Sequence, residues 1–334
     1  MGKCCKIIKG DDYMAISVQT DSNNYKVLGI LIRSERINKG FSLRDLGSLT
    51  NISHTLISNI ENGKQSPAPD TLADIFRVLE LDFHDDPKIS LKLNTKSFEI
   101  YNYIFNQDYE IASTLMRELE AEEDIFLYSV GVVNYIVLKC FFYNITNASN
   151  ATIVHMMEHY EKVIDFFTDD QKQVFYFTKG LYHLNHEHWN KATIWFEKAL
   201  EMGDKELDVF IKEYQIVSLV RQFKFIDAYR YSLEVIKEFE DRTIYIRAMK
   251  TKLQVARIMY HIAKNEETEE LVTYVHRFAV KFKITELIED CEMLRAGINI
   301  RLERYDLAQE FINKIPNQNG VTTSLLKFKI AFVQ

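Results

Sequence analysis

Hydrophobic residues recur at helical spacing along most of the chain. Between residues 25 and 84 they alternate with polar residues in short runs, which predicts four short helices in one small domain. The first run ends at Gly40, and Ser42 and Ser53 are suitable N-caps for the second and third helices. Two prolines precede the fourth helix, which we expect over residues 70–79.

Longer helices in repeating pairs are predicted over residues 98–334. Four alanines each lie three residues after an aromatic residue, in the pairs Tyr109/Ala112, Trp189/Ala192, Phe225/Ala228 and Tyr305/Ala308. The steps between these alanines are 80, 36 and 80 residues, and 80 is twice 40. A period of about 34 to 40 residues with small residues where helices cross is typical of an α-solenoid, and we expect about six helix pairs.

The remaining segments are predicted to be connections. Residues 1–24 show no sustained helical period and are expected to form a flexible tail, and residues 85–97 are expected to form a linker. The 334 residues include only 4 prolines and 11 glycines, so few turns are forced. The predicted fold class is therefore all-α, with a small N-terminal domain followed by a helical repeat domain.

The N-terminal pattern resembles a known DNA-binding family. The stretches Leu28–Arg33, Gly40–Ser42 and Ile57–Lys64, with Pro67 and Leu72, resemble the XRE/Cro-type helix-turn-helix family. The repeats resemble tetratricopeptide repeats, best at Gly180, Trp189, Ala192, Phe196 and Ala199. This combination resembles the RNPP superfamily of Gram-positive peptide-pheromone receptors. The resemblance implies a cytoplasmic, homodimeric transcription regulator whose repeat domain binds a short signalling peptide that alters DNA binding.

The helix-turn-helix resemblance implies which residues contact DNA. In this family the N-terminal residues of the third helix lie at base edges in the major groove. One such domain, here the N-terminal head (residues 25–84), covers half of an inverted-repeat operator in double-stranded DNA. Base contacts are expected from His54, Thr55, Ser58 and Asn59, and phosphate contacts from Ser42, Arg44, Asn62 and Lys64. Asn59 can pair bidentately with adenine, and the free N–H groups after Ser42 suit a phosphate. The alternative interpretation is an ordinary solvated helix face.

Three other positions of the head bear on this resemblance. Arg36 and Glu61 stand where family members often form an ion pair between the first and third helices, which is a structural contact. Leu43 stands directly after Ser42, where the family often has glutamine. The leucine removes one polar contact that the family would make with DNA.

Peptide-binding residues are predicted on the first helices of the repeat pairs, which line the concave groove of tetratricopeptide solenoids. The candidates are Asn134, Arg221, Arg247, Lys250, Gln254 and Arg257. The last four form a basic stripe with spacings of 3, 4 and 3 residues, which could bind a peptide carboxylate or could be an ordinary solvated face. By resemblance, Asn134 binds a ligand backbone, and the alternative is a satisfied core amide.

Charge and composition narrow the class of protein. The net charge is −7, but residues 26–80 hold seven Lys/Arg and six Asp/Glu, so the acidic excess lies in the repeats. A near-neutral head can still bind DNA if its positive groups face one way. The four cysteines form no CxxC pair, which favours a reducing cytoplasm. No apolar run approaches the ~20 residues of a membrane helix, so no membrane partner is expected.

We expect no enzymatic activity, metal or cofactor. His155, Glu158 and His159 match an inverted zinc-protease pattern, but no third ligand can be identified downstream. The chain has no Walker loop, no GxGxxG sequence and no nucleophile elbow. Two alternatives to a peptide receptor remain open. One is a DNA-tethered adaptor whose repeats bind a protein partner, and the other is a phage or mobile-element regulator of the same architecture.

Overall fold

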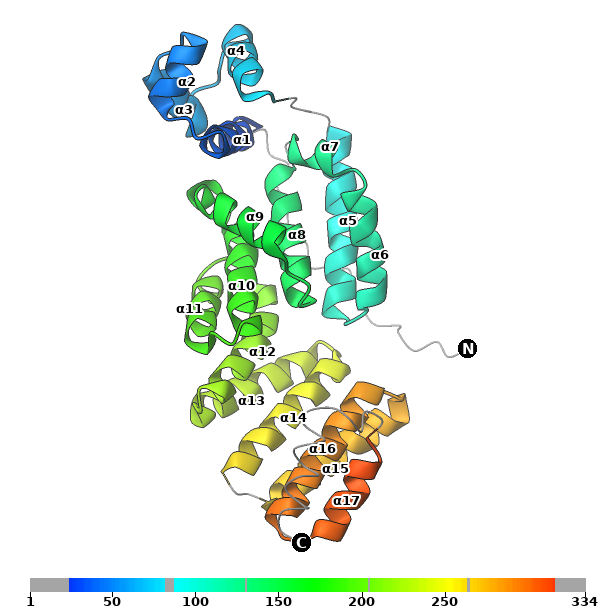
Figure 1. The fold of residues 1–334 in the computed structure, drawn as a ribbon. Helices are drawn as coiled ribbons and strands as arrows, with labels where there is room; N and C mark the ends of the chain where they lie inside the picture. Colours follow the sequence, from blue (N-terminus) through cyan, green and yellow to red (C-terminus); the bar gives the residue numbers. More distant parts are fainter. Residues whose placement is uncertain (1–23, 82–86, 130, 204, 263–264, 316–334) are drawn as a thin grey trace. The chain divides into compact units, whose positions relative to one another are not determined.

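A computed structural model of the chain describes residues 24–81, 87–129, 131–203, 205–262 and 265–315. Every regular element in these ranges is a helix (Figure 1). Contacts divide the chain into two compact units, with the boundary inside α12, between Ile211 and Lys212. The first unit includes the four-helix head and the helices α5–α11, and the second continues to the end of the repeats.

The head consists of four short helices around one apolar core. The helices are α1 (Asn24–Asn38), α2 (Leu43–Thr50), α3 (His54–Glu61) and α4 (Pro69–Leu79). The most deeply buried core residues include Ile32, Leu46, Ile57 and Ile75. A Cβ atom at Gly29 would lie 2.6 Å from the carbonyl oxygen of Ile60, so a glycine allows α1 to pass close to the end of α3. This packing fixes the direction of α3.

Paired helices follow the head in the first unit. They are α5 (Pro87–Phe105), α6 (Tyr109–Glu120), α7 (Glu123–Leu127), α8 (Val132–Ile145), α9 (Ala151–Glu161), α10 (Asp169–Asn185) and α11 (Trp189–Leu200), with a 3-10 turn at Ile164–Phe166. Consecutive helices pack as the pairs α5/α6, α8/α9 and α10/α11 (Figure 1). Where α10 crosses α11, the ring of Phe196 lies so near Gly180 that a Cβ atom there would collide with it.

Of the predicted linker, residues 85–97, the first two lie outside the described residues, and residues 87–97 are the first three turns of α5. The prediction of a linker was wrong because Pro87 suggests a break in the chain, whereas proline is well suited to the first turn of a helix. Leu93 and Ile100 are completely buried and anchor α5 in the body. The predicted tail, residues 1–24, falls outside the described residues except for its last position, where α1 begins.

The second unit continues the same organisation. Its helices are α12 (Lys205–Arg221, which spans the boundary), α13 (Phe225–Asp241), α14 (Tyr245–His261), α15 (Asn265–Phe282), α16 (Thr285–Arg301) and α17 (Tyr305–Asn313). The four alanines of the repeat pattern are completely buried, each in the first turn of α6, α11, α13 or α17. These alanines therefore mark the points where helices approach closely, as the repeat pattern predicts. No helix in the described ranges has both the length and the apolar character needed to cross a membrane.

Candidate functional site

Helix α3 presents a polar face that is set up by its N-cap and its buried face. Ser53 Oγ accepts a hydrogen bond from Leu56 N at 3.2 Å, which fixes the start of the helix. His54 and Thr55 follow in the first turn and are exposed, and Asn59 is half-buried one turn later. Because Ile57 and Ile60 are buried in the head core, these polar residues remain on the outer side of α3.

Two predicted DNA contacts on α3 are bonded to each other. Asn62 Nδ2 donates to the carbonyl oxygen of Ser58 at 2.6 Å and to its Oγ at 3.3 Å. The Asn62 amide therefore closes the C-terminal turn of α3 and positions the Ser58 hydroxyl. Lys64 lies just beyond this turn and is exposed, as is Arg44 on α2.

The N-terminus of α2 is held by a capping box. Asp45 N donates to Ser42 Oγ at 3.1 Å, and Ser42 N donates to Asp45 Oδ2 at 2.8 Å. Hydrogen bonding of the carboxyl with the side chain and the backbone N–H of Ser42 lowers the pKa of Asp45, which is therefore negatively charged at neutral pH. The Ser42 hydroxyl is engaged within the helix end, so a phosphate here would be bound through the backbone N–H groups of Leu43 and Arg44.

Arg36 and Glu61 form a buried, bidentate ion pair. Arg36 Nε and Nη2 donate to the two carboxylate oxygens of Glu61 at 2.6 and 2.9 Å, and Arg36 Nη1 donates to the carbonyl oxygen of Phe41 at 2.8 Å. Three donors of one guanidinium thus connect α1, the start of the α2 turn and the end of α3. The pair sets the orientation of α3 relative to α1 and faces the core.

The basic stripe on α14 is largely paired with acidic residues. Arg247 is 2 % exposed and pairs with Glu213 of α12, so it lies inside the unit. Lys250 pairs with Glu286 of α16 at 2.8 Å, and Arg257 pairs with Asp290 of α16 at 3.0 Å. The other two candidates have different settings: Gln254 is half-buried on α14, and Arg221 is exposed as the last residue of α12. The stripe connects three neighbouring first helices.

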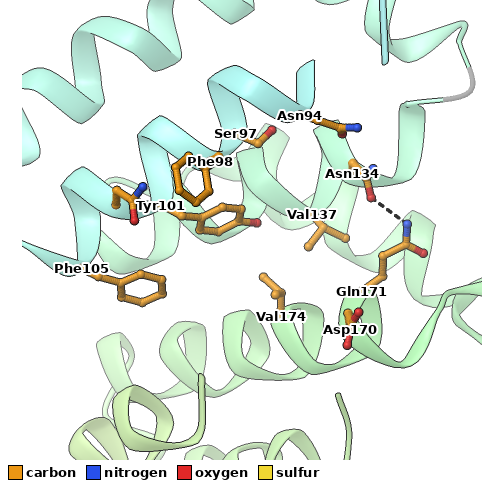
Figure 2. A pocket seen from close by; sticks show the side chains of 11 residues that line it. Asn94, Ser97, Phe98, Tyr101, Phe105, Asn134, Val137, Asp170, Gln171 and Val174 are labelled. Carbon is orange, nitrogen blue, oxygen red and sulfur yellow. Dashed lines mark hydrogen bonds between the residues drawn. The ribbon is translucent and has the colours of Figure 1, made fainter. Parts of the chain in front are cut away.

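Asn134 lies in a groove formed by the first helices of three successive pairs (Figure 2). The α5–α8–α10 groove is lined by Asn94, Ser97, Phe98, Tyr101, Asn102 and Phe105 of α5, by Asn134 and Val137 of α8, and by Asp170, Gln171 and Val174 of α10. Its cavity volume is about 60 Å³, whereas pockets for small molecules usually enclose ~300–1,000 Å³. The groove therefore has room for a single side chain of a larger ligand.

Aromatic side chains make one wall of the groove, and hydrogen-bonding groups make the other. Tyr101 stacks on Phe105 and packs against Phe141 behind it, with ring centroids 6.3 and 5.5 Å apart. Burial raises the pKa of Tyr101 far above its ordinary value, so its hydroxyl is neutral at physiological pH. Across the groove, Gln171 Nε2 donates to Asn134 Oδ1 at 2.7 Å (Figure 2).

Residues 32–85 match the family model described as helix-turn-helix. This segment is an XRE-type helix-turn-helix domain. The helix-turn-helix domain makes the protein a DNA-binding regulator, as the motif predicted. No curated protein is significantly similar in sequence.

Solved structures extend the comparison to the repeats. The apo form of RapI is 17 % identical, with a TM-score of 0.57, and the match covers 72 % of this chain and 70 % of RapI. PlcR from Bacillus thuringiensis, in complex with the peptide PapR7 and DNA, is 13 % identical over 80 % of this chain and 99 % of PlcR, with a TM-score of 0.44. ComR from S. thermophilus is 15 % identical over 93 % and 100 %, with a TM-score of 0.30. The likeness to RapI shows that the helical-repeat fold is shared.

Several groove residues were missed by the sequence-based prediction. Phe98, Tyr101 and Phe105 follow one another at helical spacing, a signal that was available, but the predicted linker ended immediately before them. Gln171 could be found only as the fourth residue of the Thr168-x-x-Gln171 capping box, which gives no hint of its contact with Asn134 37 residues away. The described residues contain no group of three potential metal ligands.

Proposed function

We propose that this protein is a sequence-specific transcription regulator that reads its operator with α3. His54, Thr55, Ser58 and Asn59 contact base edges, and Ser42, Arg44, Asn62 and Lys64 position the phosphate backbone. At Ser42 the phosphate is bound through the main-chain N–H groups of the two residues that follow it. The observation that carries this proposal is the polar outer face of α3, which is held by the buried Arg36–Glu61 pair within a matched helix-turn-helix domain. Two copies on an inverted repeat would give the protein a homodimeric form.

Asn59→Ala tests this reading of DNA. Selection of bound duplexes from a random pool with the full chain should enrich an inverted repeat. On that repeat, the substitution should cost about 1–3 kcal/mol of binding free energy and relax the preference at one base pair, because one bidentate base contact is lost. Lys64→Ala is the matched control, since loss of a phosphate contact weakens all sequences equally. An equal loss on all duplexes for Asn59→Ala would contradict base contact.

We further propose that the α5–α8–α10 groove binds a short signalling peptide, and that binding changes the affinity for DNA in the cytoplasm. Support comes from the location of the groove on the first helices of three successive pairs, its aromatic wall and its size, which suits one anchoring side chain. The peptide would bind one of two conformations of the repeat domain more tightly than the other. The ratio of its two affinities would set how far the equilibrium between these conformations shifts.

A peptide titration of the protein–operator complex tests the regulatory step. A saturable change in operator affinity with a peptide of five to ten residues is the expected result. The alternative, an adaptor whose repeats bind a folded protein, predicts that such peptides leave operator affinity unchanged. The basic stripe on α14 provides less support for peptide binding than the groove does, because Arg247, Lys250 and Arg257 each have an acidic partner.

A further inference from the structure

A chain of hydrogen bonds leads from the backbone of α10 to Asn134 in the groove. Thr168 N donates to Gln171 Oε1 at 3.0 Å, and Gln171 N donates to Thr168 Oγ1 at 3.3 Å, which together form the capping box of α10. The same Gln171 side chain then donates through Nε2 to Asn134 Oδ1 at 2.7 Å. One side chain therefore both caps α10 and contacts α8.

This chain fixes which end of the Asn134 amide faces the ligand. A backbone N–H can only donate, so the atom of Gln171 that faces Thr168 N must be its oxygen. The side-chain nitrogen of Gln171, Nε2, then faces Asn134, so Asn134 must accept this hydrogen bond with its own oxygen, Oδ1. Asn134 Nδ2 is left over, and within the described part of the chain it donates to no protein acceptor. The Asn134 amide is therefore held as a hydrogen-bond donor toward the groove.

The rest of the lining agrees with a ligand that offers an acceptor and an apolar group. Ser97 Oγ is buried in the groove wall and has no protein partner in the described ranges. The Tyr101 hydroxyl is neutral, and the rings of Phe98 and Phe105 provide apolar contact area. Among the described residues that line the groove, Asp170 is the charged one, and lysine and arginine are missing. A ligand carboxylate would find no cation among these lining residues.

We propose that Gln171 is a positioning residue that holds the Asn134 amide, which the resemblance already assigns to a ligand backbone, as a hydrogen-bond donor toward the groove. The groove then takes the neutral backbone carbonyl of an apolar peptide residue and not a C-terminal carboxylate. This inference rests on the proposed peptide-receptor function and specifies the ligand chemistry of that site. It also assigns the charged stripe on α14 no part in this recognition.

Gln171→Glu provides a specific test, because glutamate is a normal capping-box residue. The new carboxylate still accepts from Thr168 N, so α10 keeps its cap. It cannot donate to Asn134 Oδ1, so the Asn134 amide turns over, donates to the carboxylate and presents its oxygen to the groove. Gln309→Glu is the matched control, since Gln309 Nε2 donates to Asn313 Oδ1 at 2.8 Å in the same kind of contact on α17.

The probe is a positional-scanning library of hexapeptides that carry fluorescein on a C-terminal lysine side chain, each prepared as the free acid and as the amide. Polarisation with the full-length protein should find sequences that bind equally, within about twofold, in both forms. Gln171→Glu and Asn134→Asp should each lower the affinity for these peptides by on the order of tenfold. The double variant should bind them no more weakly than Asn134→Asp alone. The melting temperature of Gln171→Glu and the affinity of Gln309→Glu should stay at wild-type values.

Each other outcome overturns a defined part of this account. If hexapeptides bind but the free acid is at least about tenfold tighter than the amide, the groove recognises a carboxylate and the inference fails. Additive losses in the double variant, or wild-type binding by Gln171→Glu, would show that Gln171 does not act through Asn134. If no hexapeptide binds to the wild-type protein, the proposed receptor function itself fails, and the inference fails with it.

Discussion

The α5–α8–α10 groove and the basic stripe on α14 both lie on first helices of the repeat, but they use their polar groups differently. In the groove, Asn134 accepts a hydrogen bond from Gln171, and its two N–H donors have no acceptor among the described residues. In the stripe, Arg247 and Lys250 pair with acids on neighbouring first helices, 34 and 36 residues away. One repeat period thus separates each cation from its partner. A periodic charge pattern on one helix therefore does not show whether its charges are available to a ligand.

The largest expected difference between the two regions is in stability. Arg247→Ala would leave Glu213, which is 16 % exposed, without its partner inside the second unit. Breaking a buried pair in this way should lower the free energy of unfolding by about 3–5 kcal/mol, measured by urea titration. Glu213→Gln provides the comparison, because it removes the carboxylate charge but keeps an oxygen that can accept a hydrogen bond from Arg247. A loss below about 1 kcal/mol for Arg247→Ala would mean that the pair is solvated.

The pH dependence of stability should reveal the same pair. Burial raises the pKa of Glu213, although Arg247 and Lys250 oppose this shift. A carboxyl whose pKa is higher in the folded state binds its proton more tightly there, so its contribution to stability is present below the unfolded pKa and is lost as the pH rises through the folded pKa. Arg247→Ala removes the opposing charge and should steepen this loss. Urea midpoints measured from about pH 4 to about pH 7 should show it, and a variant that gains stability over this range would contradict the assignment.

A smaller effect on stability is expected in the groove. Asn134→Ala removes one accepted hydrogen bond in a half-buried position, so the free energy of unfolding should fall by only about 0.5–1.5 kcal/mol. Peptide binding, in contrast, should fall by on the order of tenfold in the polarisation assay. If Asn134→Ala lowered the free energy of unfolding as much as Arg247→Ala does, the proposed difference between the two regions would be contradicted.

The smallest effect should come from the exposed end of the stripe. Lys250 pairs with Glu286, whose side chain is 76 % exposed, and such pairs contribute about 0–1 kcal/mol. Lys250→Ala should therefore leave both the urea midpoint and hexapeptide binding close to wild type. If peptide affinity drops with this variant while Asn134→Ala binds normally, the peptide lies on α14 and the groove is not its site.

The architecture could be predicted from the sequence because it depends on local signals. N-caps at Ser42 and Ser53 mark helix starts in the head, and the buried alanines mark helix crossings in the repeats. Which polar residues of the repeats are paired, and which remain available to a ligand, could not be predicted in the same way. Whether Arg247 is paired, or Asn134 keeps a donor for a ligand, depends on contacts with helices that lie 34 and 37 residues away.

The central claim is that a peptide in the α5–α8–α10 groove changes how the helix-turn-helix domain binds DNA. The most direct test measures the affinity of the full-length protein for its selected inverted repeat, with and without the best-binding hexapeptide, for wild type and for Asn134→Asp. We predict a saturable change in operator affinity for wild type, and for Asn134→Asp a titration that is displaced to peptide concentrations on the order of tenfold higher. An equal response in both proteins, or none in wild type, would contradict the claim.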